Sequence, residues 1–139
     1  MYYLFQLFLL IILSIPVVAA DAREPRFVRV LSAEKYLRIH KNCEGCLLRR
    51  AELAELDLAS ANLRGADLQG SDLSSANLSK AKLMGANLKR ADLSSVISLV
   101  GADLSGANLV EANVRDEMLF SAKLCGAILP DGTRFQCKM

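Results

Sequence analysis

A repeat of five residues runs through most of this chain and constrains its fold more than any other feature. Leucine returns at every fifth position from Leu48 to Leu93, and after a shift of one residue beyond Val96 the series resumes at Leu99 and continues to Leu129. An amphipathic helix repeats its apolar residues about every 3.6 residues and a half-buried strand every 2, so neither element alone has this period. The repeating unit must therefore be larger than a helix turn or a strand pleat.

Most five-residue units read A-(D/N)-L-x-x, and each position has its own role. Alanine and leucine stand two residues apart, so they share one face of an extended segment, while the Asp or Asn between them points outward. The last two residues are Gly, Ser or other polar residues, which favour a tight turn. A short side followed by a turn, repeated many times, predicts a solenoid whose coils stack in parallel about 4.8 Å apart.

The glycines indicate how many sides a coil has. If there are four, residues twenty apart are equivalent, allowing one extra residue across Val96, and one side then always ends in glycine: Gly65, Gly85, Gly106 and Gly126. A glycine repeated at one corner predicts a turn that needs a positive φ there. The expected cross-section is square, with Val96 as a one-residue bulge at a corner. The core is expected to contain Leu58, Leu63, Leu68, Leu73, Leu78, Leu83, Leu88, Leu93, Leu104 and Leu109.

Residues 46–131, from CLLRRAELAELDLASANLRG to AKLCGAILPD, closely resemble the pentapeptide-repeat family. The resemblance implies an all-β solenoid, a right-handed quadrilateral parallel β-helix of about four coils, with the leucine column inside and alanine packed beside it. The flanks KNCEGCLLRR and CGAILPDGT are similar to those of exported members of the family. Leu56, Ile97 and Glu117 depart from the pattern, because they stand where alanine is expected.

The first 22 residues are interpreted as an export signal. An unbroken apolar run from Tyr2 to Ile15 is followed by Pro16 and small residues, and cleavage is expected after Ala20 or Ala22. The run is short for a membrane-spanning helix, although an uncleaved anchor is the alternative. After cleavage no membrane contact is expected. The predicted location is the periplasm or the cell exterior, or a thylakoid lumen if the organism is photosynthetic.

Two further segments are expected to close the ends of the stack, where exposed backbone and leucine would favour aggregation. Residues 23–45 form an N-terminal cap, with Ser32 starting a short helix over about residues 33–41 and Leu37 lying over the first coil. Residues 132–139 form a C-terminal cap, in which Phe135 folds back after a Pro-Asp-Gly turn.

Four cysteines in an exported chain predict two disulfides. The expected pairs are Cys43 with Cys46 and Cys125 with Cys137, because these pairs lie at opposite ends of a stack about 20 Å long. The spacing of Cys43 and Cys46 also fits a thioredoxin-like redox motif, but the βαβ context of that motif is missing. Zinc could recruit His40 beside this pair, yet a fourth ligand is missing nearby. No metal or other cofactor is therefore expected.

The outward residues give each side of the coil its own character. The first side carries Arg49, Arg50, Lys89 and Arg90, the second carries Glu52, Glu55, Asp72, Asp92 and Asp116, and the fourth has Lys82, Asp103 and Lys123 in one column. The third side becomes apolar toward the C-terminus. There Val100, Met118 and Phe120 form a candidate contact patch for a partner protein or a second copy of the chain.

The sequence thus predicts a non-enzymatic exported scaffold that binds an unidentified protein or associates with itself through its C-terminal coils. Some pentapeptide-repeat proteins bind type II topoisomerases by resembling DNA, and this is one alternative function; a CxxC redox protein is the other. Mimicry of DNA requires an acidic surface along the whole rod, whereas this chain has a net charge of +2 and cations on its first side. Nucleic acid is not expected as a partner, and the recurring surface carboxylates do not form a catalytic pair.

Overall fold

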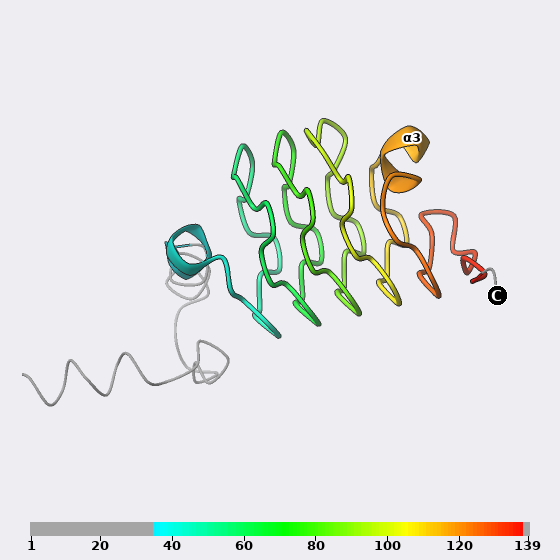
Figure 1. The fold of residues 1–139 in the computed structure, drawn as a ribbon, viewed down its shortest axis with the longest axis horizontal. Coiled ribbons are helices and arrows are strands. Elements are labelled where there is room, and N and C mark those ends of the chain that lie inside the picture. The colour runs from blue at the N-terminus through cyan, green and yellow to red at the C-terminus, as the bar shows by residue number, and fades with distance from the viewer. Residues whose placement is uncertain (1–34, 138–139) are drawn as a thin grey trace, which may run out of the picture.

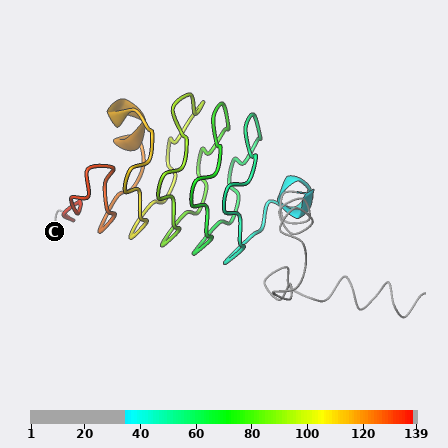
Figure 2. The same ribbon diagram turned by 180° about the vertical axis from the view of Figure 1, so that it is seen from behind.

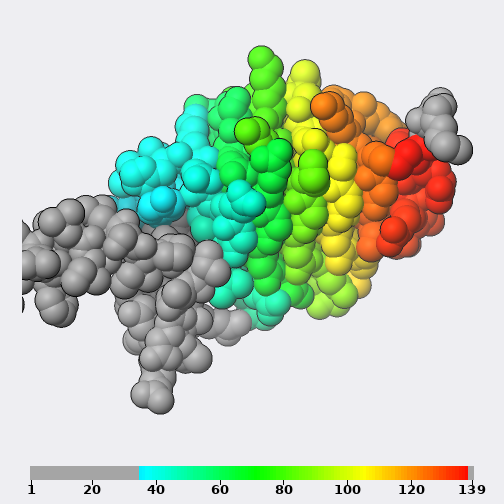
Figure 3. All heavy atoms as spheres, turned by 60° about the horizontal axis from the view of Figure 1, so that its bottom comes forward, coloured from blue at the N-terminus to red at the C-terminus, as the bar shows by residue number. Residues whose placement is uncertain are grey.

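The computed structural model describes residues 35–137, so the predicted export signal, its cleavage sites and the Ser32 cap lie outside the described residues. Within this range the chain winds into a row of stacked coils, which Figure 1 shows along the horizontal axis and Figure 2 shows from behind. The coils are joined by isolated parallel bridges. With all atoms drawn, successive coils form one continuous body (Figure 3).

Residues in neighbouring coils pair at a spacing of twenty. Asp67 pairs with Leu47 in the coil before it and with Asn87 in the coil after it. Each bridge consists of two backbone hydrogen bonds: the Leu48 N–H donates to the Asp67 carbonyl (2.8 Å) and the Asp67 N–H donates to the Cys46 carbonyl (2.9 Å). Such bridges recur every five residues, so a coil has the four sides that the glycine spacing predicts.

The interior of the coils is filled by leucine and alanine. The leucines predicted to form the core are all buried: Leu58, Leu63, Leu68, Leu73, Leu78, Leu83, Leu88, Leu93, Leu104 and Leu109. Ser71 takes an alanine place and is buried, and its hydroxyl donates to the Leu68 carbonyl at 2.8 Å, so the buried group is satisfied. Leu56, also at an alanine place, packs partly buried against the core.

The regular corners are four-residue turns whose third residue has a positive φ. At one corner the Ala66 N–H donates to the Leu63 carbonyl (3.1 Å), and Gly65 between them has a φ of 60°. This is the signature of a type II turn, and the other glycines of that column share it, as predicted: Gly85, Gly106 and Gly126. Corners on other sides hold non-glycine residues in the same conformation, among them Lys80 with a φ of 58°.

The one-residue insertion lies at Ile97 and Ser98 rather than at Val96. The Ile97 N–H donates to the Ala76 carbonyl while the Ser98 carbonyl accepts from Leu78, so two residues together oppose Asn77 as in a β-bulge. Val96 is 1% exposed and fills the alanine place, whereas Ile97 is 63% exposed. The prediction that Val96 bulges and Ile97 takes the inward place is therefore wrong, because the smaller side chain fits the space that alanine fills elsewhere.

Helix α3, Asp116–Leu119, interrupts the last coil, where the sequence predicts another plain repeat. Leu119 still reaches the core and is buried, but Glu117 is exposed and Val114, expected in the leucine column, is only partly buried. A carboxylate at an inward alanine place would be buried without a partner, which is costly. The helical turn avoids this cost by directing Glu117 to solvent while it keeps Leu119 inside.

The N-terminal end of the stack starts earlier than residue 46. Asn42 already pairs with Asn62 on the fourth side, so the earliest segment of the stack belongs to residues expected to form a cap. Residues 35–40 are helical, and Leu37 from this segment is fully buried in the core cluster. Among residues 35–137 no helix has the length and apolar character needed to cross a membrane.

At the other end the chain turns back on itself. Ile128 pairs with Arg134 in an antiparallel bridge, the Gly126 N–H donates to the Phe135 carbonyl (3.0 Å) and the Phe135 N–H donates to the Ala127 carbonyl (2.8 Å). Phe135 packs partly buried against the core. The segment after the Pro-Asp-Gly turn therefore covers part of the last coil.

Candidate functional site

Most outward Asp and Asn side chains are engaged in hydrogen bonds within the solenoid. In most of them the carboxylate or amide oxygen accepts a bond from the backbone N–H two residues later, as Asp72 does from Ser74 (2.9 Å). Asn side chains also donate to the residue one coil below, as Asn87 Nδ2 does to Asp67 Oδ1 (3.0 Å). These local turns explain why Asp and Asn occupy this position, a reason that the repeat pattern alone did not reveal.

Ion pairs join neighbouring coils along the edges of the rod. Among residues 35–137 the pairs are Lys41–Asp57 (2.7 Å), Arg49–Asp67 and Arg90–Glu111. The ammonium group of Lys41 lowers the pKa of Asp57, and the guanidinium of Arg90 lowers the pKa of Glu111. All of these groups but Asp67 are well exposed, so the pairs contribute little to stability.

On the fourth side, Lys82, Asp103 and Lys123 do form one column, since Asp103 bridges to both lysines. No ion pair is found among them in the described range. The pKa of Asp103 is lowered chiefly by a hydrogen bond from Ser105, with a smaller contribution from the Lys123 charge. The three side chains thus stand in the column that the repeat predicts, but they form no ion pair with one another.

The candidate contact patch lies on the third side, next to the bulge and α3. Val100 and Phe120 are 61% and 68% exposed, while Met118 packs half-buried against the core and contributes less surface. The structure adds Ile97, which is exposed because of the bulge and was not expected in the patch. We refer to Ile97, Val100 and Phe120 together as the apolar edge.

A backbone hydrogen bond shows that Val100 and Phe120 come from adjacent coils. The Gly101 N–H donates to the Ser121 carbonyl at 3.1 Å, which places one corner directly over the other. Val100 and Phe120 immediately precede these two residues, so their side chains stand on neighbouring coils, about 4.8 Å apart along the rod.

Helix α3 places a carboxylate beside the apolar edge. The Phe120 N–H donates to the Asp116 carbonyl at 3.1 Å, so the two residues are four apart on one helical turn. Residues with this spacing lie on the same face, with about 5–6 Å between their Cβ atoms. Asp116 and Glu117 are both exposed. An apolar anchor and acidic groups therefore share one small surface.

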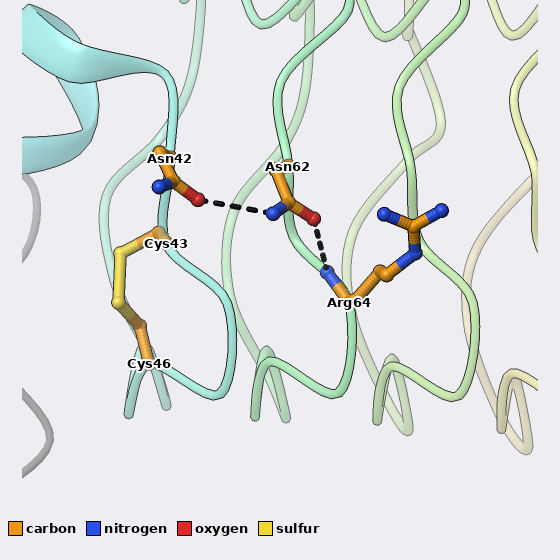
Figure 4. Close-up of a disulfide and its surroundings, with 5 residues drawn as sticks. All are labelled: Asn42, Cys43, Cys46, Asn62 and Arg64. Atoms are coloured by element: carbon orange, nitrogen blue, oxygen red, sulfur yellow. Dashed lines mark hydrogen bonds between the residues drawn. A yellow bond between two sulfur atoms is a disulfide. The ribbon is translucent and has the colours of Figure 1, made fainter.

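The cysteines are paired as the sequence predicts, Cys43 with Cys46 and Cys125 with Cys137. Cys43 and Cys46 face the interior, are 1% and 3% exposed, and span a single corner with 5.2 Å between their Cα atoms. Figure 4 shows this disulfide beside Asn42 and Asn62. Asn62 Nδ2 donates to Asn42 Oδ1, and Asn62 Oδ1 accepts from the Arg64 N–H. The second disulfide ties the turned-back segment to the last coil at an exposed position.

The other sequence-based candidates for chemistry are not brought together. The His40 ring packs against the Tyr36 ring with 4.5 Å between centroids. Cys43 and Cys46 are closed in a buried disulfide. Within residues 35–137 no three His, Cys, Asp or Glu side chains are grouped so that they could hold a metal ion.

Coils of twenty residues, with leucine inside and tight corners every fifth residue, define a solenoid protein built from five-residue repeats. The chain matches the family described as pentapeptide repeats, with eight copies, over residues 61–97 and 97–129. It belongs to the pentapeptide-repeat family, whose members have a right-handed β-helix fold.

Solved structures of several family members are similar to this chain. Rfr23 from the cyanobacterium Cyanothece 51142 is 33% identical, with a TM-score of 0.52 over 59% of this chain and 52% of that chain. A pentapeptide repeat protein from Nostoc Pcc 7120 is 37% identical over 73% of this chain and 74% of that chain, with a TM-score of 0.34. A pentapeptide repeat protein from the Arabidopsis thaliana thylakoid lumen is 30% identical over 70% of this chain and 60% of that chain, with a TM-score of 0.37.

This chain spans about half the length of Rfr23 and three fifths of the Arabidopsis protein. A comparison with curated proteins returns no match.

Proposed function

We propose that this protein is an exported, non-catalytic scaffold that binds another protein through the apolar edge. The observation that carries the proposal is the exposure of Ile97, Val100 and Phe120, each more than 60% exposed, at the one region where the repeat is broken twice. Elsewhere the corresponding outward positions are mostly polar or small. Exposed apolar side chains gathered on one surface are typical of protein contact sites.

The rest of the surface supports a structural rather than a catalytic role. Asp72, Asp92 and Asp103 each accept a hydrogen bond from the backbone two residues later, and these bonds hold their carboxylates against the coil. A general base needs a carboxylate or imidazole that can reach a substrate proton. Side chains engaged in the turns of the solenoid serve the fold instead.

The export part of the proposal rests on the apolar leader of residues 1–22 and on the two disulfides. The intact mass of the protein from the periplasmic, extracellular or lumenal fraction tests it. A chain starting at Asp21 or Arg23, with all four cysteines protected from alkylation until reduction, is the expected result. A full-length cytosolic chain with four free thiols would refute export and would reopen the topoisomerase and redox alternatives.

Binding at the apolar edge is tested by photo-crosslinking in the native cell. A benzophenone amino acid at position 100 is expected to form a discrete adduct with a partner or a second copy, and Phe120→Ser in the same chain should abolish it. The matched control carries the probe at position 84, because Met84 is also exposed but lies on the fourth side. Equal crosslinking at both positions, or an adduct that survives Phe120→Ser, would contradict the proposal.

A further inference from the structure

Charges of both signs border the apolar edge, and their arrangement is complementary to itself. On the basis of the function proposed above, we infer that the protein bound by the apolar edge is a second copy of this chain. The two copies are related by a two-fold axis, so that Lys80 of each copy faces the carboxylates of α3 in the other. Ile97, Val100 and Phe120 of both copies are covered between these charges.

Lys80 stands beside the apolar edge, on the coil that precedes Val100. The Lys80 N–H donates to the Val100 carbonyl (2.9 Å), and the Gly101 N–H donates in turn to the Ser121 carbonyl (3.1 Å), so three corners are stacked in a row. The Lys80 side chain runs along the next corner, since a Cβ atom on Gly101 would lie 3.5 Å from Lys80 Cγ. Lys80 is exposed and forms no ion pair within residues 35–137. A cation therefore borders the apolar edge.

Asp116 and Glu117 border the same edge on the coil that follows Val100. Both belong to α3, both are exposed, and they stand four and three residues before Phe120. Arg115, just before α3, is exposed as well, so two carboxylates and one guanidinium leave this corner with a net charge of −1. In the described part of the chain none of these three groups takes part in an ion pair.

Neither sign of charge dominates around the apolar edge. On the adjoining fourth side the outward column is Lys82, Asp103 and Lys123, which again alternates in sign. A strongly cationic or strongly acidic partner would meet charge of its own sign on this surface, which is unfavourable. A surface on which the two signs are separated is matched by a copy of itself, because a two-fold axis brings each patch to its opposite.

The positions of the charges fit such an axis. Lys80 ends the third side one coil before Val100, whereas Asp116 and Glu117 lie where the third side begins, one coil after Val100. The cation and the carboxylates are therefore about 10 Å apart along the rod, on a diagonal across the third side. A two-fold axis through the apolar edge exchanges the two ends of this diagonal, and the rods of the two copies cross at the contact.

The apolar side chains form the centre of this contact. Ile97, Val100 and Phe120 are exposed, and the charges lie at the margin. An apolar centre with a polar margin is the usual composition of a protein interface. The charges orient the two copies more than they add affinity. Because three side chains make a small patch, we expect a weak dimer.

Sedimentation velocity of the exported, disulfide-bonded chain tests the inference over a range from about 1 µM to about 0.3 mM. We expect a monomer–dimer equilibrium that Phe120→Ser abolishes. Lys80→Glu places carboxylates opposite carboxylates, and the double variant Asp116→Lys, Glu117→Lys places cations opposite Lys80, so each should weaken the dimer about tenfold or more. Glu55 has the same corner conformation (φ 62°), so the turn at position 80 accommodates glutamate.

A mixture of the two charge variants tests the two-fold arrangement directly. Mixed in equal amounts, they should form a heterodimer, because the new glutamate faces the new lysines and the remaining Lys80 faces the remaining carboxylates. The matched control is Arg50→Glu. Arg50 is exposed at a corner with the same left-handed conformation (φ 56°), but it lies on the first side, so this variant should dimerise as the unaltered chain does.

Three results would overturn the inference: a monomer at all concentrations, a dimer that survives Phe120→Ser, or charge variants that fail to associate when mixed. Photo-crosslinking at position 100 judges the proposed function separately. An adduct of twice the mass of the chain supports both. An adduct of another mass that Phe120→Ser abolishes overturns the inference and leaves the proposed function standing, whereas the lack of any adduct that depends on Phe120 overturns both.

Discussion

Deletion of Ile97 should leave the solenoid almost as stable as before, although it removes a residue from the middle of the stack. Without Ile97 the chain returns to a spacing of twenty, with Val96 at the alanine place and Ser98 opposite Asn77 as now. Little burial is lost, since the Ile97 side chain is 63% exposed. The main cost is that Ser95, whose φ is not positive, must adopt the left-handed turn of its counterpart Ser75, at about 1–2 kcal/mol.

Deletion of Asn77, the equivalent residue one coil earlier, provides the contrast. It removes the hydrogen bond from the Asn77 N–H to the Leu56 carbonyl (2.9 Å) and pulls Leu78 out of the core. Leu78 is fully buried, and loss of a buried leucine side chain costs about 2–5 kcal/mol. We therefore expect the Asn77 deletion to lower the free energy of unfolding by about 3 kcal/mol or more, and the Ile97 deletion by about 2 kcal/mol or less.

Urea unfolding followed by far-UV circular dichroism measures both, since the chain has no tryptophan. Ile97→Ser is the matched control, because it keeps the bulge and removes only the exposed side chain, and it should be nearly neutral. If both deletions lower the free energy of unfolding by similar amounts, or if the Ile97 deletion lowers it more, the bulge contributes to the stability of the stack and the prediction is wrong.

Three further predictions concern the corner at Lys80, the C-terminal disulfide and the loss of stability at low pH. Lys80→Gly should raise the free energy of unfolding by up to about 1 kcal/mol, because glycine adopts the positive φ of this corner without strain, although it also increases the entropy of the unfolded chain. Lys82→Gly, in the middle of a side, should lower the free energy of unfolding. Urea unfolding that ranks the two variants the other way would contradict this. Cys137→Ser should lower the free energy of unfolding by about 3 kcal/mol, and hydrogen exchange should show faster exchange at the Phe135 amide; no change in either would mean that the disulfide does not hold the turned-back segment. Hydrogen bonds from Ser74 lower the pKa of Asp72 from 3.8, so the carboxylate stabilises the fold above about pH 4 and loses this effect as the pH falls through the lowered pKa. Asp72→Asn should therefore flatten the decline of the urea unfolding midpoint between about pH 4 and pH 2. An unchanged decline would refute this.

The regular part of the fold follows directly from the sequence. A glycine every twenty residues specifies four sides, because a left-handed corner strongly favours glycine, and Gly65 and Gly85 do adopt a positive φ. The leucine column specifies the interior in the same way. The backbone conformation preferred at the corners and the burial of the leucines favour the same fold at nearly every repeat, so few other folds are compatible with the sequence.

The irregular parts were harder to predict, for reasons that lie in particular residues. Val96 and Ile97 are both apolar, so hydrophobicity alone does not indicate which of them turns inward. Helix α3 was missed because Leu119 keeps its place in the leucine column although its neighbours become helical. The earliest fourth-side segment, around Asn42, was missed because Cys43 stands where the repeat has leucine.

The candidate site was predicted only in part. Val100 and Phe120 could be placed on the third side from their repeat positions, and both are exposed. Ile97 was not included because its exposure depends on the location of the bulge. The position of Asp116 beside Phe120 depends on α3, which the repeat pattern does not contain.

The coil of twenty residues also allows the rod to change its length in fixed steps. Because every side returns to the same direction after one coil, inserting or removing a whole coil ahead of Leu93 would shift the apolar edge along the rod by about 4.8 Å and leave it facing the same way. The antiparallel pairing of Ile128 with Arg134 stops the parallel ladder on the first side, so growth there must come from within the stack. The length of the rod and the direction in which the apolar edge faces can therefore change separately, in steps of one coil.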